Sequence, residues 1–429
     1  MRRIALLLGL ILFSVIPYRA QTTDDTEARL KALEARIGAL EAEIQSLKAA
    51  KAGEEKAPAS RAPEPQAGTA AAPAAPAAVT ATPSAPGEFG GQLPVYGGAS
   101  AAAKALNPDI SVIGDFLGSI GKNPVRPVPA LEMHESEVGL QAIVDPYARA
   151  DFFLSFGEEG VNLEEGYLTF TSLPAGLVAK VGKMRAAFGK VNTLHNHVLP
   201  WVDRPLVTES LVGGEDGIDD VGFSITRILP APKNIFLEGT AQVFRGDSDE
   251  LFQAAQKRDV SLVGHLRGYR DLTDNTNIDF GVSLARGHND AGVLLGSNAF
   301  RTQLYGMDST VRWRPLRRSI YHSFVGRTEL VWSEREEPLT VQRAFGLYTS
   351  ADYQFGRRWF VGGRFDRSDR ARTSNLTDSG FATVLTYWPS EFSQIRGQYR
   401  FVRYADGRDG NELRFQFQFS LGAHGAHPF

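Results

Sequence analysis

The stretch that decides the fold class is Leu413–Leu421, which reads LRFQFQFSL. Every odd-numbered residue in it is leucine or phenylalanine, and every even-numbered residue is arginine, glutamine or serine. Successive side chains of a strand point to opposite faces, so this strand has one apolar face and one polar face. A soluble β-sandwich can show the same alternation. A charged polar face opposite an aromatic-rich apolar face is typical of a barrel with lipid outside and water inside.

The same period of two recurs through residues 107–429. It is clearest in 305–314, 358–366 and 394–401, where large apolar residues alternate with charged or polar ones. We count sixteen candidate strands, near 108–117, 132–144, 147–156, 162–172, 177–187, 219–228, 235–245, 258–269, 277–286, 301–314, 320–333, 342–355, 358–367, 380–388, 392–404 and 412–421. The predicted fold class is all-β: a sixteen-stranded antiparallel transmembrane β-barrel over 107–429.

The connections between these candidates alternate in length. If the first strand runs outward, the even connections are short and most of them carry proline or glycine, as at Pro146, Pro174 and Pro315. The odd connections are mostly longer: 188–218, 246–257, 287–300, 334–341, 368–379 and 405–411. Aromatic residues lie beside the short turns, as in an interfacial girdle: Trp313, Tyr321, Phe355, Trp359, Tyr387 and Trp388. Short periplasmic turns and long external loops predict a place in the cell outer membrane.

Three segments precede the predicted barrel. Residues 1–20 are predicted to be a signal peptide, because Arg2 and Arg3 precede a short apolar run. Residues 21–51 contain a heptad seam formed by Leu30, Leu33, Ile37, Leu40, Ile44 and Leu47. Residues 52–106 form an Ala/Pro-rich linker without large apolar residues, which we expect to be disordered and extended.

The heptad seam predicts a short α-helical coiled coil in the periplasm. A coiled coil implies a homo-oligomer that associates through residues 30–47. A lone amphipathic helix packed on the barrel is the alternative interpretation.

Composition limits the classes of function. The absence of cysteine excludes disulfides, thiolate metal sites and a cysteine nucleophile, and the net charge of -3 does not favour nucleic acid as a partner. The Gly-x-Ser-x-Gly motif of serine hydrolases is absent, so we expect no enzyme and no cofactor. Two hypotheses are a passive channel for small polar solutes or ions, surrounded by outer-membrane lipid, and a structural tether that contacts the cell wall.

Several short motifs carry a family resemblance: NPDIS at Asn107–Ser111, VDPY at Val144–Tyr147, LHNH at Leu194–His197, VDRPLV at Val202–Val207 and AHPF at Ala426–Phe429. The chain resembles Gram-negative outer-membrane porins of the phosphate-selective group. It resembles more closely the uncharacterised proteins labelled zinc-regulated TonB-dependent outer membrane receptor. The resemblance covers most of residues 107–429 and implies a porin-like barrel. It also implies an alternative function as a metal-regulated receptor or transporter. Receptors of that class have a plugged lumen, whereas a helix and a linker precede this barrel.

The longest connection, 188–218, lies between the fifth and sixth candidate strands. We expect it to fold into the lumen and constrict it, because a loop of this length is usually functional. Its candidate constriction residues are His195, His197, Asp203, Arg204, Glu215, Asp216 and Asp219. Its acidic end is expected to face basic residues of the pore wall: Arg312, Arg327, Arg364, Arg396 and Arg400. The alternative is a solvated loop over the mouth of the barrel.

Two histidines of this connection also suggest a metal site. His195 and His197 are two residues apart, so on an extended segment they can share a metal ion, although a site needs three or four ligands. Asp203, or His134 and Glu137 of the second candidate strand, could complete the site only if the fold brings them close. Hydrogen bonding within the loop is the alternative role for the two histidines.

Overall fold

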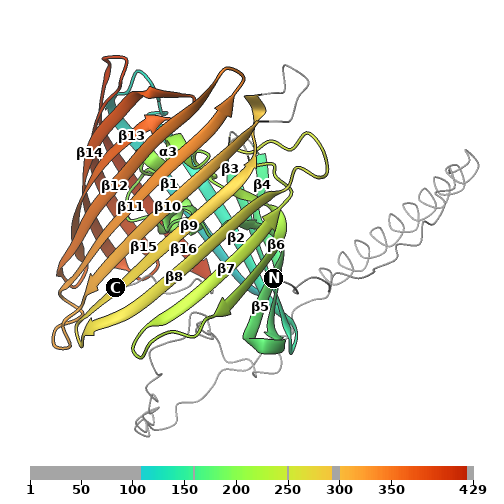
Figure 1. Cartoon of the computed structure of the whole chain (residues 1–429). Helices are drawn as coiled ribbons and strands as arrows, with labels where there is room; N and C mark the ends of the chain where they lie inside the picture. Colours follow the sequence, from blue (N-terminus) through green and yellow to red (C-terminus); the bar gives the residue numbers. More distant parts are fainter. Residues whose placement is uncertain (1–107, 158–159, 249–250, 292–299, 423–429) are drawn as a thin grey trace, which may run out of the picture. The chain divides into compact units, whose positions relative to one another are not determined.

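The computed structural model describes residues 108–157, 160–248, 251–291 and 300–422. In this part of the chain, sixteen strands form one closed sheet, in which each strand pairs with its sequence neighbours and β1 pairs antiparallel with β16 (Figure 1). The strands are β1 Asp109–Lys122, β2 Leu131–Asp145, β3 Ala148–Gly157, β4 Gly160–Leu173, β5 Leu177–Arg185, β6 Asp219–Ile228, β7 Phe236–Phe244, β8 Ser261–Thr273, β9 Thr276–His288, β10 Arg301–Trp313, β11 Ser323–Glu337, β12 Thr340–Gly356, β13 Trp359–Arg370, β14 Thr373–Ser390, β15 Ser393–Arg403 and β16 Asp409–Gly422. The predicted sixteen-stranded antiparallel barrel is confirmed. The signal peptide, coiled coil and linker expected in 1–106 lie outside the described residues.

The barrel wall is apolar outside and polar inside. In β16, Phe415 and Phe417 are 46% and 45% exposed, whereas Gln416 and Gln418 are each 2% exposed. A soluble protein usually buries phenylalanine and exposes glutamine, so this distribution is reversed. Such a reversal is required of a barrel whose outer face contacts lipid, and a soluble β-sandwich does not account for it.

The prediction of two of the long external loops is wrong. Residues 334–341 and 368–379 are mostly strand, and the connections there are 338–339 and 371–372. Near the first of these turns, Glu334 of β11 pairs with Arg343 of β12 at 3.2 Å, and both side chains are exposed. The outer face is therefore polar at this height. The strands continue past the apolar band, where apolar and polar residues no longer alternate and the sequence pattern loses its period of two.

Aromatic rings gather beside the short turns at the other end of the barrel. The ring centroid of Trp359, at the start of β13, lies 4.5 Å from that of Tyr387 and 6.4 Å from that of Phe355. Trp359 and Phe355 are 40% and 46% exposed. This position suits an aromatic belt at a membrane–water interface.

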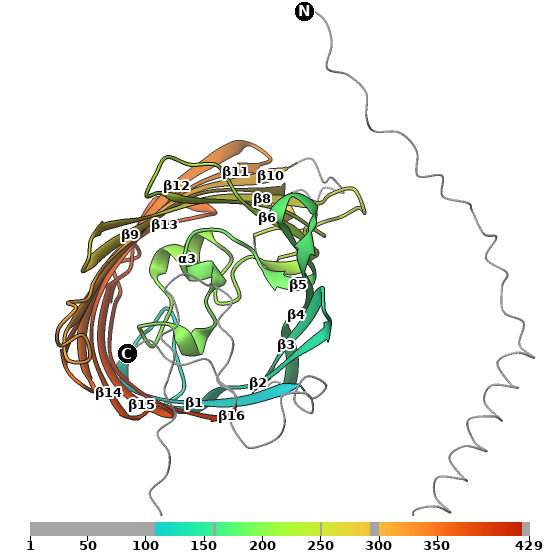
Figure 2. The ribbon, with the colours of Figure 1, turned by 90° about the horizontal axis from the view of Figure 1, so that it is seen from below.

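The connection between β5 and β6, residues 186–218, is called the inward loop below. It carries two 3-10 helices, η2 (Val191–Thr193) and η3 (Asn196–Val198), and one short α-helix, α3 (Leu206–Leu211). Figure 2 shows α3 inside the ring of strands. Among the helices in the described ranges, none has the length and apolar character to cross a membrane.

Candidate functional site

Polar residues of the barrel wall bind the backbone of the inward loop. The amide of Gly189 donates to Oγ of Ser283 on β9 at 2.9 Å, and the amide of Val202 donates to Oε1 of Gln398 on β15 at 2.9 Å. Ser283 and Gln398 point into the barrel and are 3% and 0% exposed. Contacts to strands on different parts of the wall place the loop within the barrel rather than over its mouth.

Apolar side chains of the inward loop explain why it enters the lumen. Phe188 and Trp201 are 0% and 1% exposed and belong to one buried cluster with Leu304 of the wall. Fully burying a large apolar side chain contributes about 1.5–3 kcal/mol. The wall leaves room for the loop, because a Cβ atom at Gly346 of β12 would lie only 2.7 Å from Cγ2 of Val207. One side of the lumen is therefore filled by a small apolar core.

Three arginines, Arg364, Arg396 and Arg400, are called the wall arginines below, and they hold the middle of the inward loop. Asp203 accepts from Nη2 of Arg364 at 3.0 Å, and Nε of Arg400 also lies 3.0 Å from its carboxylate. Nη1 of Arg396 donates to the carbonyl of Trp201 at 3.1 Å. Burial raises the pKa of Asp203, but Arg364 and Arg400 outweigh burial and hold that pKa well below its usual value.

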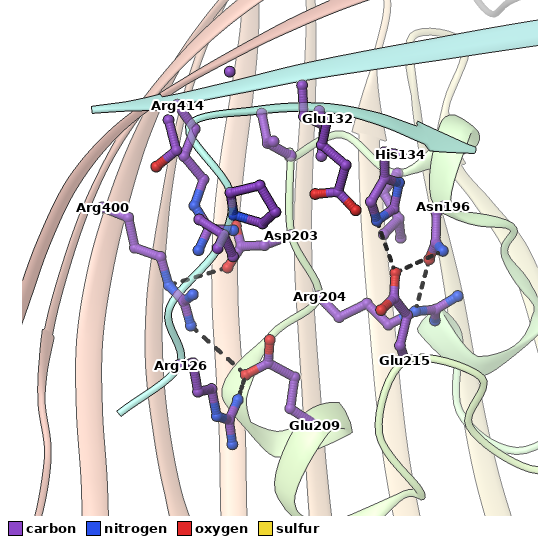
Figure 3. A pocket seen from close by; sticks show the side chains of 17 residues that line it. Arg126, Glu132, His134, Asn196, Asp203, Arg204, Glu209, Glu215, Arg400 and Arg414 are labelled. Atoms are coloured by element: carbon purple, nitrogen blue, oxygen red, sulfur yellow. Dashed lines mark hydrogen bonds and ion pairs between the residues drawn. The ribbon is translucent and has the colours of Figure 1, made fainter. Parts of the chain in front are cut away.

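A pocket of about 260 Å³ lies between the inward loop, β1, β2 and the β1–β2 connection. Charged residues of both signs line it. Arg126, Arg400 and Arg414 lie on one side together with Asp203 and Glu209, and Glu132 and Glu215 lie on the other together with His134 and Arg204 (Figure 3). Charged groups on both sides of a narrow polar space act on any charged or dipolar solute there.

Two acidic residues of the inward loop join it to the sides of this pocket. Glu209 of α3 contacts Nη2 of Arg400 at 3.6 Å and also pairs with Arg126. Glu215 lies 3.0 Å from Nε2 of His134 on β2, and this hydrogen bond lowers the pKa of Glu215. The pocket lining therefore depends on the position of the loop.

Arg204 stabilises the inward loop through hydrogen bonds to other residues of the same loop. Its guanidinium donates to the carbonyls of Val191 and Leu194 at 3.2 and 2.8 Å and to Oδ1 of Asn196 at 3.0 Å. Burial lowers its pKa to about 10, so Arg204 still carries a positive charge at neutral pH.

A second group of titratable residues lies where the inward loop meets β2 and β4. Nδ1 of His195 lies 2.7 Å from Oε2 of Glu137 and 3.0 Å from Oε2 of Glu164, and its Nε2 lies 2.9 Å from Oε2 of Glu165. Burial lowers the pKa of His195, but the three carboxylates outweigh burial and raise it well above its usual value. Nδ1 of His197 lies 3.6 Å from Oε2 of the same Glu137. The fold thus places the carboxylate of Glu137 next to both histidines. This is the arrangement in which the three side chains could share a metal ion.

The expected partners of the acidic end of the loop are wrong. Glu215 faces His134 and Asn196 instead of a wall arginine. Asp219 is the first residue of β6, so its position is set by the β5–β6 ladder, and it pairs with Lys183 at 2.9 Å. Asp216 is exposed, and its carbonyl accepts from Arg185 at 2.8 Å.

The loop carboxylates that contact the wall arginines are those of Asp203, which contacts Arg364 and Arg400, and of Glu209, which contacts Arg400. Arg312 and Arg327 lie elsewhere on the wall. Arg312 is 3.9 Å from Asp279, and Arg327 pairs with Asp352. Neither of these two arginines lines the pocket.

Sequence reasoning missed Glu135, Glu164 and Glu165. Glu164 and Glu165 are adjacent, so strict alternation would place one of them in lipid. The pairing of β3 with β4 shifts register between Phe153 and Leu154, opposite this pair. A β-bulge gives one strand an extra residue, and here both glutamates are buried, at 6% and 9% exposure. Two adjacent glutamates within an otherwise alternating strand were the available signal.

No protein-family model matches the chain. An uncharacterized protein of Aquifex aeolicus (strain VF5) is 30% identical over 79% of this chain and 83% of that protein. The chain belongs to the same family as the Aquifex protein.

Three solved structures have the same fold as the present chain. An anion-selective porin from Comamonas acidovorans has a TM-score of 0.51 and 10% identity, and the match covers 73% of this chain and 99% of that one. OprB of Pseudomonas putida has a TM-score of 0.52 and 8% identity, with 75% and 95% covered. OmpT, an outer membrane protein of Vibrio cholerae, has a TM-score of 0.50 and 7% identity, with 73% and 97% covered. The chain therefore has the barrel fold of outer-membrane porins.

Proposed function

We propose that the protein is a passive channel of the cell outer membrane for small polar or ionic solutes, and that the inward loop is its constriction. The observation that carries this proposal is the polar pocket beside the loop, where Arg126 and Arg414 lie opposite Glu132 and Glu215. The apolar outer face of the wall supports a membrane location. The likeness to an anion-selective porin supports a channel.

The arrangement inside the barrel has a direct consequence for permeation. The apolar core that includes Trp201 fills part of the lumen, so solutes would pass on the polar side, beside β1 and β2. Charged residues on both sides of this path favour hydrated ions and dipolar molecules over apolar ones. The narrow section then controls both the conductance and the ion preference of the channel.

The segments ahead of the barrel complete the proposal. The N-terminal part would lie in the periplasm, and the seam over 30–47 would join copies of the chain into a homo-oligomer. This arrangement is compatible with a contact between the coiled coil and the cell wall.

Charge substitutions in the pocket test the ion path. Purified full-length protein is inserted into a planar bilayer, and the reversal potential is measured in a salt gradient. We expect Arg126→Gln to shift the preference towards cations and Glu132→Gln to shift it towards anions, because each change removes one sign of charge from the pocket. Arg343→Gln is the matched control, since this side chain is 76% exposed outside the pocket. Equal reversal potentials in all four proteins would place the ion path elsewhere.

Removal of the loop tests the constriction. Deleting 194–212 should raise single-channel conductance, since the narrowest section dominates the resistance of a pore. A deletion of 253–258 in the β7–β8 connection controls for the shortening of a loop as such. A wild-type protein that inserts but gives no conductance steps would refute the channel and leave the tether hypothesis.

A further inference from the structure

Six titratable residues form a buried group that the channel function does not use. Glu135 and Glu137 come from β2, Glu164 and Glu165 come from β4, and His195 and His197 come from the inward loop. They are called the acid–histidine cluster below. The glutamates and His197 are all between 2% and 9% exposed. Three segments that are far apart in the sequence thus contribute ionisable groups to one small volume.

The ligand atoms of this cluster have the spacing of a metal site. One nitrogen each from His195 and His197 and one carboxylate oxygen of Glu137 all lie within 4.8 Å of one another. Around Nδ1 of His195, Oε2 of Glu137 lies at 2.7 Å and Oε2 of Glu164 at 3.0 Å. Tetrahedral zinc with bonds of about 2.0 Å separates its ligands by about 3.3 Å. To reach that spacing, the oxygens of Glu137 and Glu164 would move away from Nδ1 of His195 by about 0.6 and 0.3 Å.

The position of Glu165 is an independent indication of a built site. Its carboxylate lies 2.9 Å from Nε2 of His195, the ring nitrogen opposite the one that meets Glu137. Histidine ligands usually donate their second ring N–H to a carboxylate, which fixes the tautomer and the orientation of the ring. Glu165 is held in turn by the backbone amide of Arg185, at 2.8 Å.

The carboxylates of the cluster lie close to one another in the interior. Four of them are buried together, and Arg185 pairs with one of them, Glu164, at 3.3 Å. In the described part of the chain, Oε1 of Glu135 is buried without a hydrogen-bond partner. Uncompensated buried carboxylates are costly, and they must either take up protons or bind a cation.

We propose that Glu137, His195 and His197 bind one divalent transition-metal ion, of which Zn²⁺ is the probe, and that Glu164, 3.0 Å from Nδ1 of His195, supplies a further oxygen beside it. Glu165 orients His195, and Glu135 adds negative charge beside the site. Binding displaces the proton that Nδ1 of His195 shares with Glu137 and Glu164, so proton release accompanies it.

The ion links the inward loop to β2 and β4. It can enter from the polar pocket, whose lining includes Asn196, and Asn196 donates to Oε2 of Glu135 at 3.2 Å. This inference goes beyond the channel function, because metal binding requires only the folded barrel and its loop. Loss of conductance and loss of metal binding are therefore separate results.

Zinc titration of purified full-length protein, first stripped with a chelator, tests the proposal. Calorimetry should detect one Zn²⁺ per chain. We expect Glu165→Gln to weaken binding about 10- to 100-fold, as the loss of an orienting partner does. His197→Gln and Glu137→Gln remove ligands and should weaken binding more. His322→Gln is the matched control, because His322 lies outside the cluster and its Nδ1 contacts Tyr353.

Co²⁺ bound to the wild type gives a second readout that needs no variant. Four-coordinate Co²⁺ has intense visible absorption bands, whereas loosely bound hydrated Co²⁺ has weak ones. Intense bands that disappear on addition of Zn²⁺ would support the site. The proposal is overturned if the wild type binds no Zn²⁺, or if His197→Gln and His322→Gln bind it equally well.

Discussion

Arg364 of β13 places its Nη2 atom 3.0 Å from Oδ2 of Asp203, and the two side chains are 0% and 5% exposed. The guanidinium also lies 4.8 Å from the ring centroid of Trp201, and its Nε contacts Asp366 at 2.8 Å. The middle of the inward loop is thus attached to the wall by a buried charge pair. Removal of one partner from such a pair typically costs about 3–5 kcal/mol, because the other charge stays buried without compensation.

The Asp203→Asn variant should therefore loosen the inward loop without unfolding the barrel. Asparagine keeps the size of the side chain but leaves Arg364 and Arg400 facing a neutral group. We expect faster proteolysis within the loop and noisier single-channel currents. Asp216→Asn is the control, since Asp216 is exposed. Protease resistance equal to that of the wild type would show that the charge pair does not hold the loop.

The pH dependence of this attachment follows from the lowered pKa of Asp203. A carboxyl whose pKa is depressed by folding contributes stability above its unfolded value, and loses it as the pH falls through the folded value. The difference in loop stability between the wild type and Asp203→Asn should stay constant from pH 7 down to about pH 4, which is close to the pKa of an aspartate in the unfolded chain. It should shrink at lower pH. Proteolysis with an acid-active protease measures the difference, and a decline already at pH 6 would contradict the assignment.

The side chain of Trp201 attaches the inward loop to the wall by apolar packing, in addition to the charge pair between Asp203 and Arg364. It is 1% exposed, and its ring lies edge-on to that of Tyr348 with centroids 5.2 Å apart. Truncation of a buried tryptophan to alanine typically costs about 3–5 kcal/mol. We expect Trp201→Ala to lower the melting temperature of the loop region and to raise conductance. Trp332→Ala should do less, because Trp332 is 39% exposed on the outer face, where lipid can fill the gap. Equal effects of the two changes would argue against a packed lumen.

The stalk hypothesis concerns residues outside the described ranges. If the seam over 30–47 joins the chains, charges placed in it should weaken association, because a carboxylate cannot be buried between helices. We expect the Leu33→Asp, Leu40→Asp double variant to dissociate in analytical ultracentrifugation while its barrel stays folded. Lys31→Asp, outside the seam, is the control. A wild type that is already monomeric would disprove the hypothesis.

The fold could be predicted because lipid constrains one face of every strand. Phe415 and Phe417 of β16 must be apolar to contact acyl chains, so the period of two survives in the sequence. Where the strands leave the apolar band, as at Glu334 and Arg343, that constraint ends. The ends of β11 to β14 beside the connections 338–339 and 371–372 were therefore not readable, although the strand count and the opposite ends were.

The sequence predicted where the site lies but not which residues contact one another there. The length of the inward loop indicated where functional residues would lie. The partners of Asp203 come from β13 and β15, and which inward residue meets it depends on barrel register and on how the loop packs. Glu164 faces inward only because of a bulge. Such features arise from three-dimensional packing and leave little periodic signal in the chain.

The facing of the last strand gives the sharpest test of the barrel. Phe417 is 45% exposed on the outer face, whereas its neighbour Gln418 is 2% exposed and paired in register with Asp115 of β1. Arginine at a lipid-facing position near the bilayer midplane costs about 2–4 kcal/mol. Arginine at position 418 instead lies beside Asp115, whose Oδ1 lacks a hydrogen-bond partner among the described residues. We therefore expect Phe417→Arg to lower the unfolding free energy in lipid vesicles far more than Gln418→Arg does. Equal losses in the two variants would mean that this strand does not face lipid on its phenylalanine side.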